Sequence, residues 1–266
     1  MRSSNMVLGN FASKTAQQTS PAPYGAPDQQ GYGYPAPPQA GARMTVDDVV
    51  MRTITLLAVT GVTAALSWML LPPALALPLM VVGSILGLVA MLAISFMRIT
   101  NPAIIIGYAV LQGLILGVIS QAFESWFPGI VLQAVIGTFG VFAVMAALYT
   151  SRIVRATPFF RKVVTGALLG ALVLFVVNFA LSMFGVDAGL FNDPTDGQGA
   201  NWFQWLLAVG LVVLAAVAFI LDFDLVEQAV RAGAEQKYAW YASFGLLVGL
   251  VFLYMQLLRL ISMFRE

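Results

Sequence analysis

Seven long apolar stretches constrain this chain more than any other feature of its sequence. Each holds about 20 residues, which is the helix length needed to cross roughly 30 Å of hydrocarbon. Only 9% of the 266 residues are charged, whereas a soluble domain carries about 25% charged residues. The sequence therefore predicts an all-α membrane protein, a bundle of seven transmembrane helices. The stretches are Val49–Leu71, Ala74–Met97, Ala103–Phe123, Ile130–Thr150, Val163–Gly185, Phe203–Leu221 and Tyr238–Phe264.

The first 43 residues have a different composition from the rest of the chain. They are rich in Pro, Gly, Gln, Ser and Tyr, and such a segment buries too little apolar area to offset its ordering entropy. A charged start followed by an apolar run, the mark of a signal peptide, is missing. We expect residues 1–43 to form a disordered tail, either featureless or carrying short docking motifs, and residues 44–266 to form the membrane domain.

Capping residues and small residues in the sequence predict where helices begin and where they pack closely. Thr45 is placed to cap the first one, with acidic residues in its first turn. Two glycine pairs, Gly113 with Gly117 and Gly166 with Gly170, are spaced by four residues. Small residues at this spacing allow close helix approach in membranes, so both pairs are interpreted as packing features.

Basic residues predict the orientation, because Lys and Arg are enriched in cytoplasmic loops. With seven spans, the connections on the N-terminal side carry the basic residues, and those on the other side carry none. The longest of the latter instead holds Asp187, Asp193 and Asp196. We expect a multi-pass protein of the cell membrane with its N-terminus in the cytoplasm and its C-terminus outside. The basic residues are Arg98, Arg152, Arg155, Arg161, Lys162, Arg231 and Lys237.

The chain has no Cys and no His, and this excludes most catalytic and metal-binding machinery. Thiolate chemistry, His metal ligands and the Ser–His or Cys–His pairs of hydrolases all need these residues. A net charge of +1 gives no electrostatic basis for binding nucleic acid. We predict that the protein is not an enzyme and binds no cofactor, and that carboxylates carry any proton chemistry.

Two carboxylates near the end of the sixth stretch are the leading candidates for function. Apolar residues continue beyond Asp222 and Asp224 at helical spacing, so the helix is predicted to run on to Ala232. Glu227 and Arg231 then form an i, i+4 pair. Asp222 and Asp224 point about 200° apart around such a helix, so one is expected to face the bundle and the other water or headgroups.

Three further charged residues stand at helix ends. Arg98 ends the second stretch, on the same membrane face as Asp224, and is the basic residue considered as its partner. Glu124 closes the third stretch and Arg259 lies near the end of the seventh. These two either pair with each other across helices or extend separately to the headgroups.

Several segments resemble the Bax inhibitor-1 family, also called transmembrane Bax inhibitor motif proteins, and a bacterial branch of it in particular. The resemblance covers about residues 44–266 and leaves the tail outside. It depends on the order and spacing of motifs more than on any single one. They are Leu111–Glu124, Phe223–Gln228, Glu235–Trp240 and the run of Leu257, Leu258, Arg259 and Leu260.

This resemblance implies a seven-helix bundle with the last helix near the centre and a pH-sensitive calcium leak. It also implies that an aspartate on the sixth helix and one on the seventh share a proton or a hydrogen bond and gate the pore. Asp224 matches the first of these best, with Asp222 as the alternative. The second falls on Val248 or Gly249, which cannot titrate, so a single titration is expected in place of two coupled ones.

The sequence leaves three functions to compare. The first is a leak for a cation, Ca²⁺ or H⁺, since carboxylates supply the oxygen ligands that Ca²⁺ prefers. The second is a membrane protein that transports nothing and binds stress-response or protease partners. The third, a secondary transporter, is disfavoured because the sequence shows no repeated halves. The lipid bilayer is the expected surrounding, and the sequence does not determine an oligomeric state.

Overall fold

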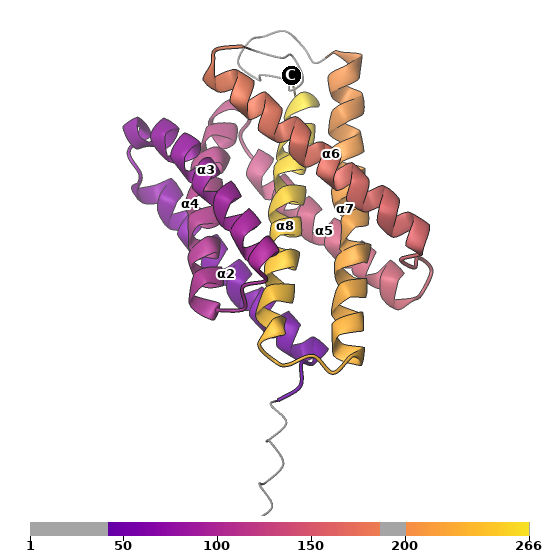
Figure 1. The fold of residues 1–266 in the computed structure, drawn as a ribbon. Helices are drawn as coiled ribbons and strands as arrows, with labels where there is room; N and C mark the ends of the chain where they lie inside the picture. The colour runs from indigo at the N-terminus through magenta and orange to yellow at the C-terminus, as the bar shows by residue number, and fades with distance from the viewer. Residues whose placement is uncertain (1–41, 187–200, 266) are drawn as a thin grey trace, which may run out of the picture. The chain divides into compact units, whose positions relative to one another are not determined.

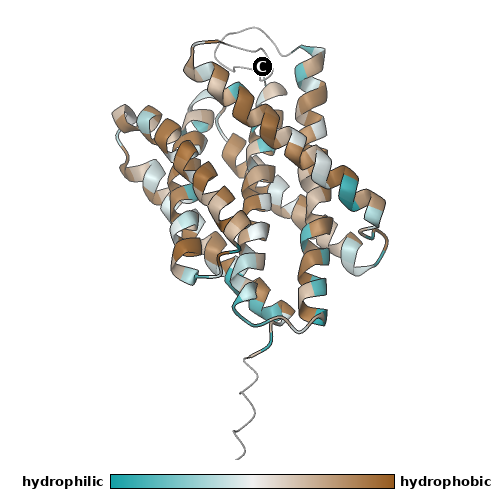
Figure 2. Cartoon of the chain, viewed as in Figure 1, coloured by the Kyte–Doolittle hydropathy of each residue, from teal (hydrophilic) through white to brown (hydrophobic). Residues whose placement is uncertain are grey.

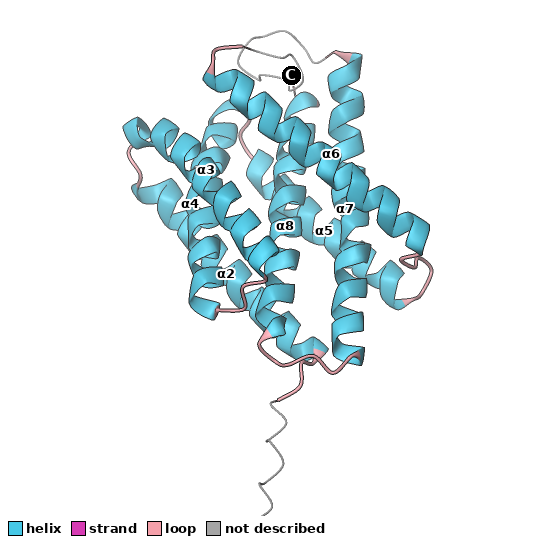
Figure 3. Ribbon diagram, in the orientation of Figure 1, coloured by secondary structure: helices cyan, strands magenta, loops and turns pink. Residues whose placement is uncertain are grey.

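The computed structural model describes residues 42–186 and 201–265. Most of the predicted tail and the acids Asp187, Asp193 and Asp196 lie outside this part of the chain. The described part is seven helices joined by short connections, without a β-strand (Figures 1 and 3). All seven are long and apolar enough to cross a membrane, which confirms the predicted fold class. They are α2 (Val46–Leu70), α3 (Pro73–Met97), α4 (Pro102–Trp126), α5 (Ile130–Thr150), α6 (Pro158–Met183), α7 (Trp202–Arg231) and α8 (Tyr238–Met263).

Helix ends follow the capping signals of the sequence. Thr45 and Asp48 form a capping box at the start of α2, as the Thr45 prediction anticipated. The start of α6 differs from the prediction by five residues, because the Thr157 hydroxyl accepts a hydrogen bond from the Phe160 N–H and Pro158 occupies the first helical position. Arg161 and Lys162, assigned above to a connection, therefore stand in the first turns of a helix.

The last helix, α8, lies near the centre of the bundle, as the family resemblance implied (Figure 1). It packs against α2, α4, α5 and α7, and its side chains Leu247, Leu253 and Leu258 are fully enclosed. By contrast, α6 contacts chiefly α7 and has few buried residues. A helix surrounded on most sides by others has little lipid-facing surface, so α8 forms the axis on which the remaining helices are arranged.

One of the two glycine pairs is a packing feature and the other is not. A Cβ added at Gly113 would lie 2.9 Å from Thr63 Cβ, and one at Gly117 would lie 2.7 Å from Ser67 Cβ. The absence of a side chain at these positions lets α2 and α4 approach closely, as small residues do in membranes. The packing prediction is wrong for Gly166 and Gly170, where an added Cβ meets no atom within 4 Å.

The segment before α2 is held against the connection between α7 and α8. The Met44 N–H donates to the Ala234 carbonyl at 2.8 Å, and the Gln236 N–H donates to the Ala42 carbonyl at 2.8 Å. Met44 is buried, and the Arg52 guanidinium donates to the Gln236 carbonyl at 2.5 Å. Ala42 and Met44 thus belong structurally to the helical unit that begins at residue 41.

The molecule has two chemically different ends. The start of α2 and the α3–α4, α5–α6 and α7–α8 connections share one end, which we call the basic end, and the chain finishes at the opposite one (Figure 1). Hydrophilic residues gather around the start of α2 and the α7–α8 connection, whereas the middle of the bundle is largely hydrophobic (Figure 2). Many large apolar side chains are exposed there, which suits a surface in contact with lipid.

Candidate functional site

Asp224 lies in the last third of α7 and is held by a neighbouring helix. Its Oδ2 forms an ion pair with the Arg161 guanidinium of α6 and accepts a hydrogen bond from Gln228 Nε2 at 2.7 Å. The Asp224 side chain is 19% exposed, compared with 45% for Arg161. Arg161, and not Arg98, is therefore the cation beside Asp224, so the partner considered from the sequence was wrong. The ion pair joins α6 to α7 at the basic end.

Asp222 points to a different helix from Asp224, as their angular separation requires. A Cβ added at Gly249 of α8 would lie 3.3 Å from Asp222 Oδ2 and 3.0 Å from Phe219 Cε1. The missing side chain at Gly249 therefore makes room for Phe219 and for the Asp222 carboxylate. Of the two aspartates, Asp222 is the one against α8, where the resemblance places a second acid that this sequence lacks.

A third carboxylate, Glu227, is held between α5 and its own helix. It accepts a hydrogen bond from the Tyr149 hydroxyl of α5 and forms an i, i+4 ion pair with Arg231. The predicted Glu227–Arg231 pair is confirmed, whereas nothing in the sequence pointed to Tyr149. Together, Asp224 and Glu227 tie the end of α7 to α6 and to α5.

Asp224 and Glu227 line a cavity of about 990 Å³ at the basic end. Its walls come from α2, α5, α7 and α8, and the α5–α6 connection adds Arg152 and Arg155. Apolar side chains such as Ile54 and Phe142 cover the deeper part. The cavity is thus apolar toward the middle of the bundle and charged at its mouth.

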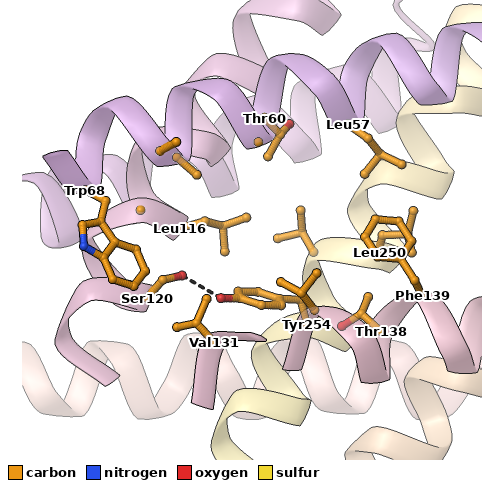
Figure 4. A pocket seen from close by; sticks show the side chains of 16 residues that line it. Leu57, Thr60, Trp68, Leu116, Ser120, Val131, Thr138, Phe139, Leu250 and Tyr254 are labelled. Carbon is orange, nitrogen blue, oxygen red and sulfur yellow. Dashed lines mark hydrogen bonds between the residues drawn. The ribbon is translucent and has the colours of Figure 1, made fainter. Parts of the chain in front are cut away.

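A second cavity of about 350 Å³ continues in the same direction between α2, α4, α5 and α8. Figure 4 shows Trp68 at one end of it and Leu57 with Phe139 at the other. The Tyr254 and Ser120 hydroxyls are hydrogen-bonded at 2.7 Å on its wall. Leu57 and Phe139 also line the larger cavity, so the two meet at these apolar side chains.

The remaining predicted site residues lie away from these cavities. Arg98 caps α3 in a left-handed conformation and is exposed. Both oxygens of Glu124 bind backbone at the start of α5, accepting from the Gly129 N–H at 2.5 Å and the Val131 N–H at 3.1 Å. Glu124, near the end of α4, therefore caps the start of α5. Arg259 is partly enclosed near the end of α8, with its Nε among buried atoms.

A comparison with models of protein families finds one match. The family model described as Bax inhibitor 1 like matches residues 6–266. The chain belongs to the Bax inhibitor 1-like family. This match begins at residue 6, so the statement that the first 43 residues lie outside the resemblance was wrong. No curated protein matches the chain.

The seven helices of the described part of the chain and the central α8 agree with what the resemblance implied, but the site departs from the two-aspartate arrangement. Val248 and Gly249 offer no carboxylate, and Gly249 instead makes room for Asp222. Within residues 42–186 and 201–265, no group of three or more acidic residues could hold a metal ion. The ionisable groups gathered here are the carboxylates of α7 with the arginines and the Tyr149 hydroxyl beside them.

Proposed function

We propose that this Bax inhibitor 1-like protein is a pH-sensitive leak for cations, Ca²⁺ or H⁺, with Asp224 as the pH-sensing residue. The observation that supports this most is the position of Asp224. Its carboxylate lines the 990 Å³ cavity and is paired with Arg161 on α6, the helix least enclosed by others. Asp224 lies at the cavity mouth and also holds the peripheral helix α6. Protonation of its carboxylate therefore affects the position of that helix.

The two cavities together form the proposed path for the cation. Along α2, the larger cavity runs from Val46 to Leu57 and the smaller from Leu57 to Trp68. Eleven residues of helix rise about 16 Å, so the two cavities in line extend about 32 Å, close to the roughly 30 Å of hydrocarbon. Leu57 and Phe139 close the path where the cavities meet, because an apolar constriction excludes water and ions.

The ion pair between Arg161 and Asp224 determines whether the leak rises or falls with pH. Arg161 of α6 and Asp224 attract each other only while the carboxylate is ionised, so the pair is lost as pH falls. The other charged or titratable groups around Asp224 are Glu227 and Arg231 on its own helix, Tyr149 of α5 and the arginines of the α5–α6 connection. Protonation of Asp224 removes the ion pair that joins α6 to α7 at the basic end, and we expect the leak to increase toward low pH.

The test is Ca²⁺ uptake into liposomes that contain the purified protein, measured from pH 8 down to about 4, because a free aspartate titrates at about 3.9. Asp224→Asn removes the negative charge and Arg161→Gln removes its partner, so both variants should leak at neutral pH and lose the pH dependence. Asp222→Asn should change the pH dependence less, because Asp222 does not belong to either cavity lining. Glu235→Gln is the matched control, since Glu235 pairs with Lys237 at the basic end, away from both cavities.

The two variants at the ion pair separate different roles for Asp224. If the carboxylate binds the passing cation, Asp224→Asn lowers uptake while Arg161→Gln raises it, and the ion-pair mechanism is then wrong. If the wild-type protein takes up no Ca²⁺ at any pH and proton flux is also absent, the leak is refuted. In that case the alternative of a membrane protein that binds stress-response or protease partners takes its place.

A further inference from the structure

Residues of α2 and α5 that line the larger cavity are also exposed on the apolar surface of the bundle, from which we infer a lateral opening between these helices. Three large apolar side chains on its rim are strongly exposed: Val50 at 47%, Ile54 at 55% and Phe139 at 49%. In a bilayer such a surface contacts acyl chains and not water. A lipid chain is therefore the molecule with direct access to the apolar part of this cavity.

The depth of the cavity corresponds to one leaflet. Its α2 wall extends from Val46 at the start of the helix to Leu57, about 16 Å of helix rise. One leaflet contributes half of the roughly 30 Å hydrocarbon thickness. A lipid with its headgroup at the basic end would thus have its chains alongside the whole apolar wall.

The mouth of the cavity carries more positive than negative charge. Among the acids in its lining, Asp224 is paired with Arg161 and Glu227 with Arg231. Arg152 and Arg155, both in the α5–α6 connection, line the same mouth. Arg152 is also within electrostatic range of Glu227, so the site has four guanidinium groups for two carboxylates. This excess favours an anionic headgroup, since Arg binds phosphate through several N–H donors.

We propose that this cavity binds one anionic phospholipid from the leaflet at the basic end. Arg152 and Arg155 bind the phosphate, and an acyl chain lies between α2 and α5 against Ile54 and Phe139. The apolar wall alone would accept a chain from any lipid, so the arginines provide the preference for an anionic headgroup. An acyl chain there occupies the inner part of the path proposed for cations, so the lipid-bound and conducting states exclude each other. The lipid site itself depends only on the geometry of the cavity and its charge.

Lipid retention by the full chain tests the proposal. The purified protein is incubated with dioleoylphosphatidylglycerol or dioleoylphosphatidylcholine, which share the same chains, and retained lipid is counted by native mass spectrometry. We expect one phosphatidylglycerol to be retained in preference. The double variant Arg152→Gln/Arg155→Gln should lower its affinity roughly thirtyfold, since each arginine near a headgroup contributes on the order of one kcal/mol. Arg98→Gln removes an exposed arginine outside the cavity and should retain the lipid as the wild type does.

A second variant and a mapping experiment separate the cavity from general adsorption. Ile54→Trp narrows the opening between α2 and α5 without changing charge, and should lower retention of both lipids. A phosphatidylglycerol with a photoreactive acyl chain should label peptides of α2 and α5. Equal retention of the two lipids by the wild type overturns the proposal, and so does labelling spread over all helices. Equal losses in Arg98→Gln and in the double variant also overturn it, because surface charge would then explain the preference.

Discussion

Gly117 of α4 offers a sharp test of how the bundle is held together. A Cβ at this position would lie 2.7 Å from Ser67 Cβ and 3.0 Å from the Ala64 carbonyl carbon of α2. Both are atoms that a change of rotamer does not move, so Gly117→Ala requires α2 and α4 to separate. Separation also weakens the hydrogen bond at 2.8 Å from the Ser67 hydroxyl to the Leu114 carbonyl.

The size of the effect follows from two opposing terms. Overpacking in a close-packed interior costs about 1–3 kcal/mol, while Gly→Ala inside a helix contributes about 0.5–1 kcal/mol in the opposite direction. We expect Gly117→Ala to lower the free energy of unfolding by about 1–2 kcal/mol. At about 2–4 °C per kcal/mol for a chain of this size, the melting temperature should fall by roughly 2–8 °C.

The assay is thermal unfolding of the detergent-solubilised protein, with Gly107→Ala as the matched control. Gly107 lies on the same helix, and a Cβ there meets no atom within 4 Å. Its replacement should leave the melting temperature unchanged or raise it slightly. Equal shifts in the two variants would refute the reasoning, since helix propensity alone would then account for both.

Three further expectations follow from the same structure. Reporter fusions after Glu266 and within residues 187–198 should read external and one within residues 151–157 cytoplasmic; a cytoplasmic reading after Glu266 would contradict the predicted orientation. Removal of residues 1–41 should leave the melting temperature nearly unchanged, because it keeps the hydrogen bonds of Ala42 and Met44 to the α7–α8 connection, and a large drop would show that the tail packs on the bundle. Met44→Ala, by contrast, should cost about 2–5 kcal/mol, the usual range for truncating a buried Met, because only 2% of Met44 is exposed; an unchanged melting temperature would show that the segment before α2 contributes little.

The number and position of the helices could be predicted from the sequence because the bilayer imposes a one-dimensional rule. A span must be about 20 residues long and apolar, and this requirement is visible in any window of the chain. The predicted Ile130–Thr150 is identical to α5. The predicted start of α6 is five residues late because basic residues such as Arg161 and Lys162 favour a connection, although Thr157 and Pro158 carry the signal of an earlier helix start.

The candidate site illustrates what the sequence leaves undecided. Helical spacing established that Asp222 and Asp224 face different directions, but not which neighbour each would meet. The structure places Asp224 with Arg161, 63 positions earlier in the chain, and Asp222 beside Gly249. Glu124, considered as a partner for Arg259, instead caps α5.

Spans and capping boxes depend on residues within a few turns of each other, so hydropathy and spacing alone determined them for this protein. Contacts between helices depend on how each helix is rotated about its axis and how closely it approaches its neighbours. Small local features such as Gly249, Gly113 and Gly117 set those quantities, and their effect is known only once both partners are placed. For this reason the seven-helix bundle was determined by the sequence itself, whereas the ion pair between α6 and α7 and the paired cavities were decided only by the tertiary structure.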